Sequence, residues 1–475
     1  MFTLNDILQG NEDNVYLHSS EVPDPNQVFP SAQHDSRQVS RGDLFIALKG
    51  AQVDGHRYIS QAAQAGAKAA LCNQPANDVP PDFLQISVPD VIHALHSTAR
   101  VRTQRQQNTL LIGITGSNGK TSTKDAAAAI LNRVAPTLKT FASYNNEIGY
   151  PLTLLRLEPE HRYAVVEMGA QWVGELTWLC ETIARPNWSI ITNIGAAHLE
   201  YFGTQERVSV AKSELVQALT AEGIAILNYD DVYVRSMGAK TRARILYYGL
   251  SQEADVRGSD IQGDTLRGLS FTLRYAGQQK RVHLHLPGAH GVMIALAAAS
   301  VGCAARMNFD EICVALENLQ PAKGRGEIKP GPNDSTLIDD TYNANRQSIV
   351  AMIAAMRTTE LSASGKRWVV LGDIFELGQY APEEHIACGK ELVGTIDYLV
   401  AIGDQARFYV EGAKQVGMLE KNIHYFRADV ENATKLEFAK QAAANLLKRE
   451  VHNEDLVLIK GSRGMRMETM LHMLK

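Results

Sequence analysis

The sequence predicts an α/β protein of several domains, and three observations support this prediction. The chain has 475 residues, too many for one ordinary hydrophobic core, and such a length corresponds to roughly three domains. Short apolar runs alternate with amphipathic helical patterns along the chain. Near residue 110 an apolar run passes through a glycine-rich turn directly into a helical pattern, an order typical of a parallel-sheet domain.

Composition is that of a solvated globular protein. Hydrophobic residues make up 45% and charged residues 21% of the chain. The 47 basic and 52 acidic residues form no long run of one sign, so we expect no nucleic-acid partner. The amino terminus lacks the pattern of an export signal, and the longest apolar stretch, residues 292–305, is too short to span a bilayer. We therefore expect no membrane insertion, and no obligate protein partner is evident.

The cysteines favour a reducing compartment. Five of them are scattered along the chain, and no two are close enough to resemble a metal knuckle: Cys72, Cys180, Cys303, Cys313 and Cys388. This usage predicts a cytoplasmic protein with free thiols.

The first part of the chain predicts a small α/β domain. Apolar runs at residues 44–48, 69–72 and 83–86 alternate with helical patterns at 58–65 and 91–102. The polar segment that follows places the first boundary, so the first domain is expected to span residues 1–105.

The central part repeats the order strand, helix, strand, which predicts a parallel sheet within a domain of residues 106–320. Strands are expected at residues 164–166, 189–192 and 225–227. Within this domain residues 271–275 and 282–286 alternate apolar and polar positions across the turn 276–279, which predicts an antiparallel hairpin.

Two histidines of this hairpin, His283 and His285, share its polar face. They could bind a metal, but no third ligand is near in the sequence. We expect them to be solvated.

The last part, residues 321–475, again alternates strands and helices. Apolar runs end in Asp, Gly or Lys at residues 337–340, 369–373, 400–404 and 457–462. Ligands of open parallel sheets bind at the carboxyl ends of the strands, so these ends predict a binding edge. The alternative is that these residues simply cap turns.

The segment TGSNGKTS predicts a nucleoside triphosphate site. Its glycines allow backbone amides to approach phosphate oxygens, Lys120 supplies positive charge, and Thr121 can hold Mg²⁺. The strict P-loop pattern would require glycine in place of Ile114. The candidate nucleotide-binding residues of this loop are Thr115, Gly116, Ser117, Asn118, Gly119, Lys120, Thr121 and Ser122.

Two residues follow strands that should end beside this loop. Glu167 ends one predicted strand, and His198 lies just past another. A carboxylate and a neutral imidazole at this edge could bind Mg²⁺ directly or through water. Taken singly, each could be an ordinary loop residue.

Several segments of the chain together resemble one known family. The segments TGSNGKTS, NNEIGYP, VVEMGA, NIGAAHLEYFG, LPGAH, DDTYNAN, LGDIFELG and KGSRGMRME follow, in order, the pattern of the Mur ligases over the whole chain. DDTYNAN resembles the branch that adds D-alanyl-D-alanine, and the DNPR motif of the branch that adds lysine or diaminopimelate is absent.

The resemblance implies a three-domain architecture: an amino-terminal domain that binds a UDP-sugar, a central P-loop parallel-sheet ATPase domain, and a Rossmann-like carboxyl-terminal domain. It also implies an ATP-dependent ligase that uses Mg²⁺ and joins D-alanyl-D-alanine to a UDP-linked muramoyl tripeptide through an acyl phosphate. Lysine and diaminopimelate both remain open as the third residue of that peptide.

The family's functional positions fall on matching residues of this chain. Lys120, His198 and Lys212 match catalytic positions, and Lys212 is the lysine that these ligases can carbamylate. The metal positions are Thr121, Glu167, His198 and Lys212. Further ATP contacts are Asn145 or Asn146, Arg325 and Asp340. The substrate positions are Ser36, Arg37 and Lys49 for the UDP-sugar, and Asn343, Asn345, Lys460 and Ser462 on dipeptide-facing or interdomain loops.

The chain departs from the family's pattern after the PG turn, where Gly291 and Ile294 replace two asparagines expected to recognise adenine. Another ligase of the same superfamily, such as a different Mur enzyme or a folylpolyglutamate synthetase, remains an alternative. A P-loop switch or regulatory ATPase is the alternative from a different class.

Overall fold

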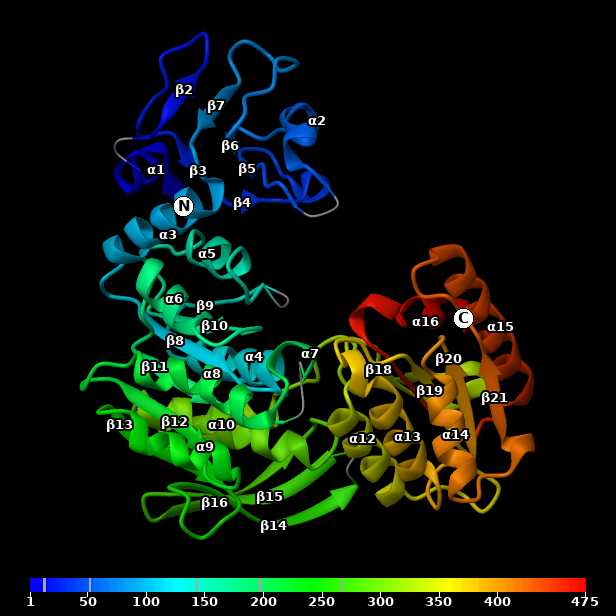
Figure 1. Ribbon diagram of the computed structural model, residues 1–475. Coiled ribbons are helices and arrows are strands. Elements are labelled where there is room, and N and C mark those ends of the chain that lie inside the picture. Colours follow the sequence, from blue (N-terminus) through cyan, green and yellow to red (C-terminus); the bar gives the residue numbers. More distant parts are fainter. Residues whose placement is uncertain (12–13, 51–52, 142–143, 196–198, 265, 267) are drawn as a thin grey trace.

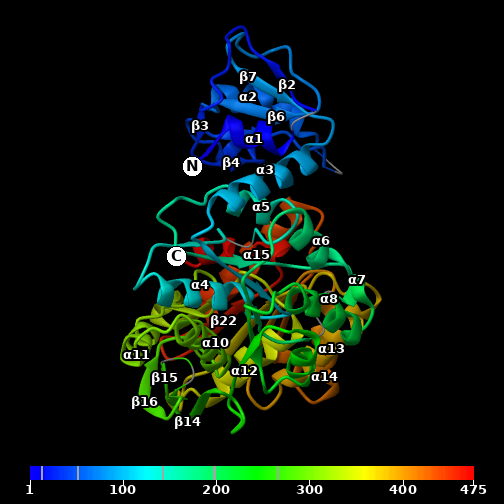
Figure 2. The same ribbon diagram turned by 90° about the vertical axis from the view of Figure 1, so that its left-hand side faces the viewer.

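The computed structural model describes the whole chain except residues 12–13, 51–52, 142–143, 196–198, 265 and 267. Three main sheets follow one another along the sequence, and helices cover them (Figure 1). The amino-terminal sheet lies above the central nine-stranded sheet in this view, and the carboxyl-terminal sheet lies beside the central one. Figure 2 shows helix α3, Val91–Arg105, lying between the first two sheets.

The amino-terminal sheet has the strand order β2-β7-β6-β5-β4. Four of its strands are parallel and β2 is antiparallel. The bounds are β2 Tyr16–His18, β4 Ala32–Gln33, β5 Leu44–Ile46, β6 Ala69–Cys72 and β7 Leu84–Ser87. A small pair, β1 Phe2–Thr3 and β3 Val28–Phe29, and the helices α1 Leu4–Gly10 and α2 Ile59–Gln64 complete this part. Asp90 caps α3 by accepting a hydrogen bond from the His93 amide, at 3.0 Å.

The central sheet has the order β16-β15-β14-β13-β12-β11-β8-β10-β9. Its parallel strands are β8 Leu110–Thr115, β9 Thr137–Lys139, β10 Tyr163–Glu167, β11 Trp188–Ile191, β12 Ile224–Asn228 and β13 Arg244–Gly249. The helices are α4 Lys120–Leu131, α5 Gly149–Leu154, α6 Glu175–Thr182, α7 Leu199–Phe202, α8 Gln205–Gln217, α9 Val232–Ser236, α10 His290–Ala304 and α11 Phe309–Glu317. Because β8 lies between β10 and β11, the loop that follows β8 meets the ends of both neighbours.

The predicted hairpin is present and larger than expected. β15 Gly268–Tyr275 pairs with β16 Gln278–Leu284, and β14 Val256–Asp264 adds a third antiparallel strand. His283 and His285 lie on its exposed face with their rings 4.8 Å apart, as predicted. The apolar residues of the same strands pack beneath α10, whose alanines allow it to lie close to the sheet.

The carboxyl-terminal sheet has the order β17-β18-β22-β19-β20-β21. All its strands are parallel except β17. The bounds are β17 Glu327–Pro330, β18 Thr336–Asp340, β19 Arg367–Gly372, β20 Tyr398–Ile402, β21 Ile423–Phe426 and β22 Leu456–Lys460. Helices α12 Arg346–Thr358, α13 Ala381–Leu392, α14 Arg407–Gln415, α15 Ala433–Glu450 and α16 Thr469–Met473 cover its two faces.

Two further observations bear on the sequence predictions. All five cysteines are free and buried. Within the part of the chain that the structure describes, no helix is both long and apolar enough to cross a membrane.

Candidate active site

The phosphate loop joins β8 to α4 and depends on two glycines. Gly116 has φ +148°, and a Cβ there would lie 1.9 Å from Thr192 Oγ1. Gly119 has φ +77° and immediately precedes the first residue of α4, Lys120. A side chain at either position would therefore strain the loop, and one at Gly116 would also collide with Thr192, which follows β11. The first turn of α4 turns its free amides toward the space above the loop.

The end of β11 braces the loop. The Asn118 amide donates to Asn193 Oδ1 at 3.0 Å, and Thr192 Oγ1 donates to the Asn118 carbonyl at 2.6 Å. The Ser117 hydroxyl accepts a hydrogen bond from the Gly195 amide at 2.8 Å. Neither residue was among the predicted site residues, although Thr192 ends the strand predicted at residues 189–192 and Asn193 begins the quoted motif NIGAAHLEYFG.

Lys120 lies in the cavity beside the loop. Its Nζ donates to the carbonyls of Gly116 at 2.9 Å and Ser117 at 3.3 Å. Burial is the main reason why the pKa of Lys120 is lowered, and Arg325 lowers it further, whereas Glu167 and Glu376 raise it. Several charges of both signs are thus gathered around this ammonium group.

Glu167 ends β10 and faces the phosphate loop, as predicted. Thr121 Oγ1 donates to Glu167 Oε2 at 2.7 Å, and Asn145 Nδ2 donates to Glu167 Oε1 at 2.8 Å. Of the two candidate asparagines, Asn145 is therefore the one at this site, because Asn146 accepts hydrogen bonds at the start of α5. His198 lies outside the described residues.

The oxygens of Thr121 and Glu167 fit a hard divalent cation. Mg²⁺ usually keeps one or two protein oxygens and takes its other ligands from phosphates and water. A cluster of three acidic, histidine or cysteine ligands is not required for such a site, and none occurs among the described residues. The donor set beside the loop is thus suited to Mg²⁺ bound together with a nucleotide.

Lys212 lies in the middle of a helix. The sequence indicates a helical pattern that starts at Lys212 and runs over residues 212–219, but this start is wrong, because Thr204 caps α8 and Lys212 lies well inside that helix. Its side chain is 1% exposed. Burial, followed by the charge of Lys120, lowers the pKa of Lys212 to about 7, whereas Glu175 and Glu167 raise it. The lysine is therefore near the predicted group of Lys120 and Glu167.

The carboxyl-terminal sheet contributes the opposite wall of the site. Lys460 Nζ donates to Asp340 Oδ2 at 2.5 Å and to the Asn343 carbonyl at 2.9 Å, which joins the ends of β18 and β22. The guanidinium of Arg325 lies over the ring of Tyr342, with Cζ 4.2 Å from its centroid. These residues lie where the two sheets meet.

Asn345 and Gln347, which belong to this wall, both contact Asn118 in the phosphate loop. Asn345 Nδ2 donates to Asn118 Oδ1, and Asn118 Nδ2 donates to Gln347 Oε1 at 2.5 Å. Ser462 Oγ, further along the same edge, accepts a hydrogen bond from the Phe375 amide at 2.8 Å. Gln347 was not singled out from the sequence, although it lies two residues after the quoted DDTYNAN motif.

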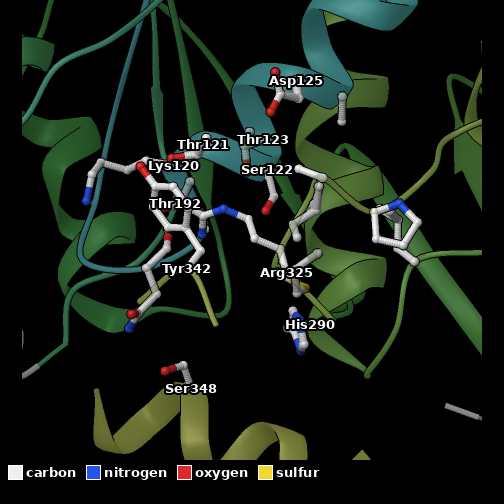
Figure 3. A pocket seen from close by; sticks show the side chains of 18 of the residues that line it. Lys120, Thr121, Ser122, Thr123, Asp125, Thr192, His290, Arg325, Tyr342 and Ser348 are labelled. Carbon is white, nitrogen blue, oxygen red and sulfur yellow. The ribbon is translucent and has the colours of Figure 1, made fainter. Parts of the chain in front are cut away.

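A cavity of about 830 Å³ lies between these walls. Figure 3 shows the first turn of α4 with Thr121 and Ser122 at one side, and Arg325 extending between Lys120 and His290. The lining includes Lys120, Thr121, Asn145, Glu167, Arg325, Asp340, Asn343, Asn345 and Lys460. The structure therefore brings most of the predicted nucleotide and dipeptide positions into one cavity.

The departure at the predicted adenine position has a physical explanation. A Cβ at Gly291 would lie 3.0 Å from both the Cβ and the carbonyl oxygen of Leu286, so a larger side chain would require these neighbours to move. Ile294 lines the cavity, together with the polar side chains of Asn318 and Gln320. The base-recognising amides expected from the family pattern are thus replaced by a different lining.

Ser36, Arg37 and Lys49 do not line this cavity. They follow the parallel neighbours β4 and β5 at the carboxyl edge of the amino-terminal sheet. Ser36 Oγ donates to Gln61 Oε1 at 3.1 Å, Arg37 pairs with Asp35, and Lys49 is exposed. The edge faces the central part of the chain, because Tyr144 contacts Gln38 and His34 there.

The site combines a phosphate loop, a lysine beside oxygen donors, and a second α/β unit that closes the cavity. These features define the class of nucleotide-dependent enzymes with a divided active site. Three family models cover most of the chain. They are the Mur ligase family, catalytic domain, at residues 31–103, the Mur ligase middle domain at 114–302, and the Mur ligase, glutamate ligase domain, at 324–463. The chain belongs to the Mur ligase family and is an ATP-dependent ligase.

Relatives with curated names match the chain over nearly its whole length. The UDP-N-acetylmuramoyl-tripeptide--D-alanyl-D-alanine ligase of Escherichia coli (strain K12) is 33% identical over 99% of this chain and 97% of that protein. The protein of the same name from Bacillus subtilis (strain 168) is 32% identical over 93% of this chain and 92% of its own length.

Two solved structures are similar to this chain over nearly its whole length. MurF from Acinetobacter baumannii has a TM-score of 0.84 and 30% identity, covering 100% of this chain and 98% of that chain. MurF ligase from Thermotoga maritima in complex with ADP has a TM-score of 0.76 and 26% identity, covering 94% of this chain and 96% of that one. The predicted three-domain Mur ligase architecture is thus confirmed.

Proposed function

We propose that this enzyme joins D-alanyl-D-alanine to UDP-N-acetylmuramoyl tripeptide with ATP, giving the UDP-muramoyl pentapeptide of peptidoglycan synthesis. The observation that carries the proposal is the shared cavity, in which the phosphate loop faces the strand ends of the carboxyl-terminal sheet. The end-to-end likeness to ligases of that name supports this choice of substrates. The reaction belongs in the cytoplasm, where its nucleotide-linked substrates and ATP are present.

We assign one substrate to each of the three parts of the chain that carry a main sheet. Residues 1–105 bind the UDP-sugar, 106–320 bind ATP, and 321–475 bind the dipeptide. The ranges of the three family models, which fall inside these limits, support the division. Ser36, Arg37 and Lys49 are the proposed UDP-sugar contacts, and Asn343, Asn345, Lys460 and Ser462 are the proposed dipeptide-facing or interdomain residues.

Phosphoryl transfer to the tripeptide carboxylate collects negative charge that the site must stabilise. Lys120 and the amides of residues 116–122 are positioned for this task, and Arg325 brings a further positive charge from the neighbouring unit. Asp340 anchors Lys460 and fixes the wall opposite the phosphates. Because the cavity lies between two units, their closure would exclude water from the acyl phosphate.

Mg²⁺ is the proposed cofactor beside ATP. Thr121 and Glu167 would hold it, together with His198 and a carbamylated Lys212. When bound, the ion would neutralise phosphate charge and orient the transferred group. Lys212 lies near Glu167 and Lys120, which supports its inclusion in this group.

The test is ADP release measured with UDP-muramoyl tripeptide and D-alanyl-D-alanine, each omitted in turn, with mass detection of the UDP-pentapeptide. We expect appreciable ADP release only when both are present. Equal ADP release without the dipeptide would contradict the ligase assignment and favour a regulatory ATPase. Replacing the dipeptide with lysine, diaminopimelate or glutamate distinguishes the other ligases of the superfamily.

A further inference from the structure

The cavity continues along α4 beyond the phosphate loop. Lys120 lines it at the start of this helix, and Asp125, Ala126 and Ala129 line it further along (Figure 3). Ala129 lies nine residues after Lys120, which corresponds to about 13 Å along the helix axis. Because the phosphates bind at the start of α4, an extended nucleotide places its base toward Ala129. The base end of the cavity is therefore the part beside Ala126 and Ala129.

Three helices pack together next to the base end. A Cβ at Gly302 of α10 would lie 2.9 Å from Ile312 Cγ1 of α11 and 3.1 Å from Ile130 Cγ2 of α4. Asn318 directly follows the last residue of α11, and it lines the cavity together with Leu319 and Gln320. The segment that leaves α11 thus forms one wall of the cavity, close to α4 and α10.

The other side chains at the base end are mostly apolar. Ala126 and Ala129 of α4 line it, as do Met293 and Ile294 of α10. Such a surface suits the two faces of a purine ring, but it offers no hydrogen bond to the edge of the ring. Gly291 adds no side chain. Side-chain hydrogen bonds to the edge of the base must therefore come from the polar residues of the lining.

Asn318 presents one fixed acceptor. Its Nδ2 donates a hydrogen bond to the Val314 carbonyl at 2.7 Å. A carbonyl only accepts, so this bond defines the orientation of the amide and leaves Oδ1 as the atom that can accept from a ligand. The 6-amino group of adenine donates hydrogen bonds, whereas the 6-oxo group of guanine or hypoxanthine accepts them. An amide held in this orientation distinguishes the two kinds of base.

The other polar side chains of this region are less suited to the distinction. No described residue holds the Gln320 amide by a hydrogen bond, so this amide can turn either its donor or its acceptor to a base. Asp125 lies one helical turn nearer to the phosphate loop than Ala129, and its Oδ1 accepts a hydrogen bond from Lys139 Nζ at 2.7 Å. Asn318 is thus the residue whose hydrogen bonding favours one base over the other.

We propose that Asn318 selects adenine, with its Oδ1 accepting a hydrogen bond from the 6-amino group of ATP. This bond supplies the base recognition that the side chains of Gly291 and Ile294 do not provide. The inference concerns ATP alone, so it holds whichever acceptor the enzyme uses. Asn318 binds the base and takes no part in phosphoryl transfer, so its loss should raise the KM for ATP and leave kcat unchanged.

Calorimetric titration with ADP and with inosine diphosphate tests the proposal, because inosine diphosphate carries a 6-oxo group in place of the 6-amino group. Wild type should bind ADP at least about tenfold more tightly than inosine diphosphate. In Asn318→Leu the affinity for ADP should fall about tenfold, and that for inosine diphosphate should stay within about threefold. A role in the shape of the wall alone would weaken both nucleotides equally.

Two further variants complete the test. Asn318→Asp keeps an oxygen acceptor and should retain the preference for ADP. Asn11→Leu is the matched control, because Asn11 Nδ2 likewise donates to the carbonyl four residues earlier, that of Ile7, at 2.9 Å, in the amino-terminal part. It should bind both nucleotides as wild type does.

Three results would overturn the inference: equal weakening of both nucleotides in Asn318→Leu, unchanged ADP binding in that variant, or no preference for ADP in wild type. An enzyme that shows the expected preference but does not use D-alanyl-D-alanine would contradict the proposed function alone.

Discussion

Asn345 caps helix α12 with its side-chain oxygen and donates its side-chain NH₂ to Asn118 in the phosphate loop. The capping oxygen accepts a hydrogen bond from the Ser348 amide at 2.9 Å. Gln347, two residues after Asn345, accepts a hydrogen bond from Asn118 Nδ2 at 2.5 Å. The phosphate loop of one sheet is thus fastened to the first turn of a helix from another sheet.

We expect Gln347→Ala to loosen this connection without harming the helix, because alanine is a good helix former and the cap at Asn345 remains. Small-angle scattering of the ligand-free variant should give a larger radius of gyration than wild type. The KM for ATP should rise a few-fold. Gln441→Ala, on the exposed face of α15, is the control and should change neither quantity. Identical scattering from Gln347→Ala and wild type would contradict this role.

Closure of the central and carboxyl-terminal units over the cavity should depend on the segment around Arg325. Gly324 and Gly326 both have positive φ, of +72° and +77°. A Cβ at Gly326 would lie 2.4 Å from Pro287 Cγ. We therefore expect Gly326→Ala to impair ligation strongly and to prevent the compaction that an ATP analogue and UDP-muramoyl tripeptide produce together in wild type.

Scattering with and without both ligands measures this compaction. Gly417→Ala is a suitable control, because Gly417 also has positive φ, +98°, yet has no atom within 4 Å of an added Cβ. Wild-type protein that does not become more compact with both ligands would count against closure.

Lys120→Ala should reduce ligation a hundredfold or more, because a preorganised positive charge beside the transferred phosphate is lost. Lys120 is held by carbonyls of its own loop, so the fold should survive its removal. ADP release and a thermal melt measure the two effects. Lys280→Ala, which removes an exposed lysine paired with Asp310, is the control. Turnover within a few-fold of wild type would mean that the loop is misassigned.

Local sequence patterns were sufficient to predict many of the strands and helices. The strand predicted at residues 164–166 lies within β10, and the one at 225–227 lies within β12, because buried parallel strands form continuous apolar runs. The start of α8 was missed, because its first turn is polar and only the cap at Thr204 marks it. β14 was also missed, since its exposed polar residues do not form an apolar run.

Pairings between distant segments could not be read from the sequence. The approach of Glu167 to Thr121 was predictable, because adjacent parallel strands end at the same edge. The contact of Asn345 and Gln347 with Asn118 depends on how two sheets are placed relative to each other, which no local pattern encodes. The same is true of the hydrogen bond from the Glu200 amide to the Glu376 carbonyl, which joins residues far apart in the chain.

His385 should make the stability of the carboxyl-terminal unit depend on pH. Burial lowers its pKa from 6.5 to about 4, because a charged imidazole would lose solvation and its Nε2 could no longer accept the Ile374 hydrogen bond. Stability from the neutral ring is present above pH 6.5 and is lost as pH falls toward 4. At about pH 5 the loss should reach about 2 kcal/mol.

Urea unfolding of wild type and His385→Gln at neutral pH and at about pH 5 checks this expectation. Wild type should be the more stable protein at neutral pH, and its advantage should shrink on acidification, because glutamine does not titrate. A constant difference between the two proteins would show that His385 is not the group responsible.

Lys212 should act as a carbamate. Its side chain is buried, and burial, followed by the charge of Lys120, lowers its pKa to about 7, so an appreciable neutral fraction is available near neutral pH. Only the neutral amine can attack CO₂, and the product carries a negative charge with oxygen donors suited to a hard cation. An ammonium group at this place would instead repel Mg²⁺. The alternative is a cationic lysine that contacts phosphate directly.

The two interpretations of Lys212, a carbamate or a cationic phosphate contact, predict opposite results for its variants. If the carbamate forms, Lys212→Ala should lose activity and short carboxylic acids should partly restore it, whereas Lys212→Arg should stay inactive. Removal of CO₂ should lower wild-type activity most below about pH 7, where the ammonium form prevails. Carbon NMR with labelled bicarbonate should give a carbamate signal in wild type and in the exposed-lysine control Lys240→Ala, and none in Lys212→Ala. Full activity of Lys212→Arg, with no rescue of Lys212→Ala, would leave an ordinary phosphate contact.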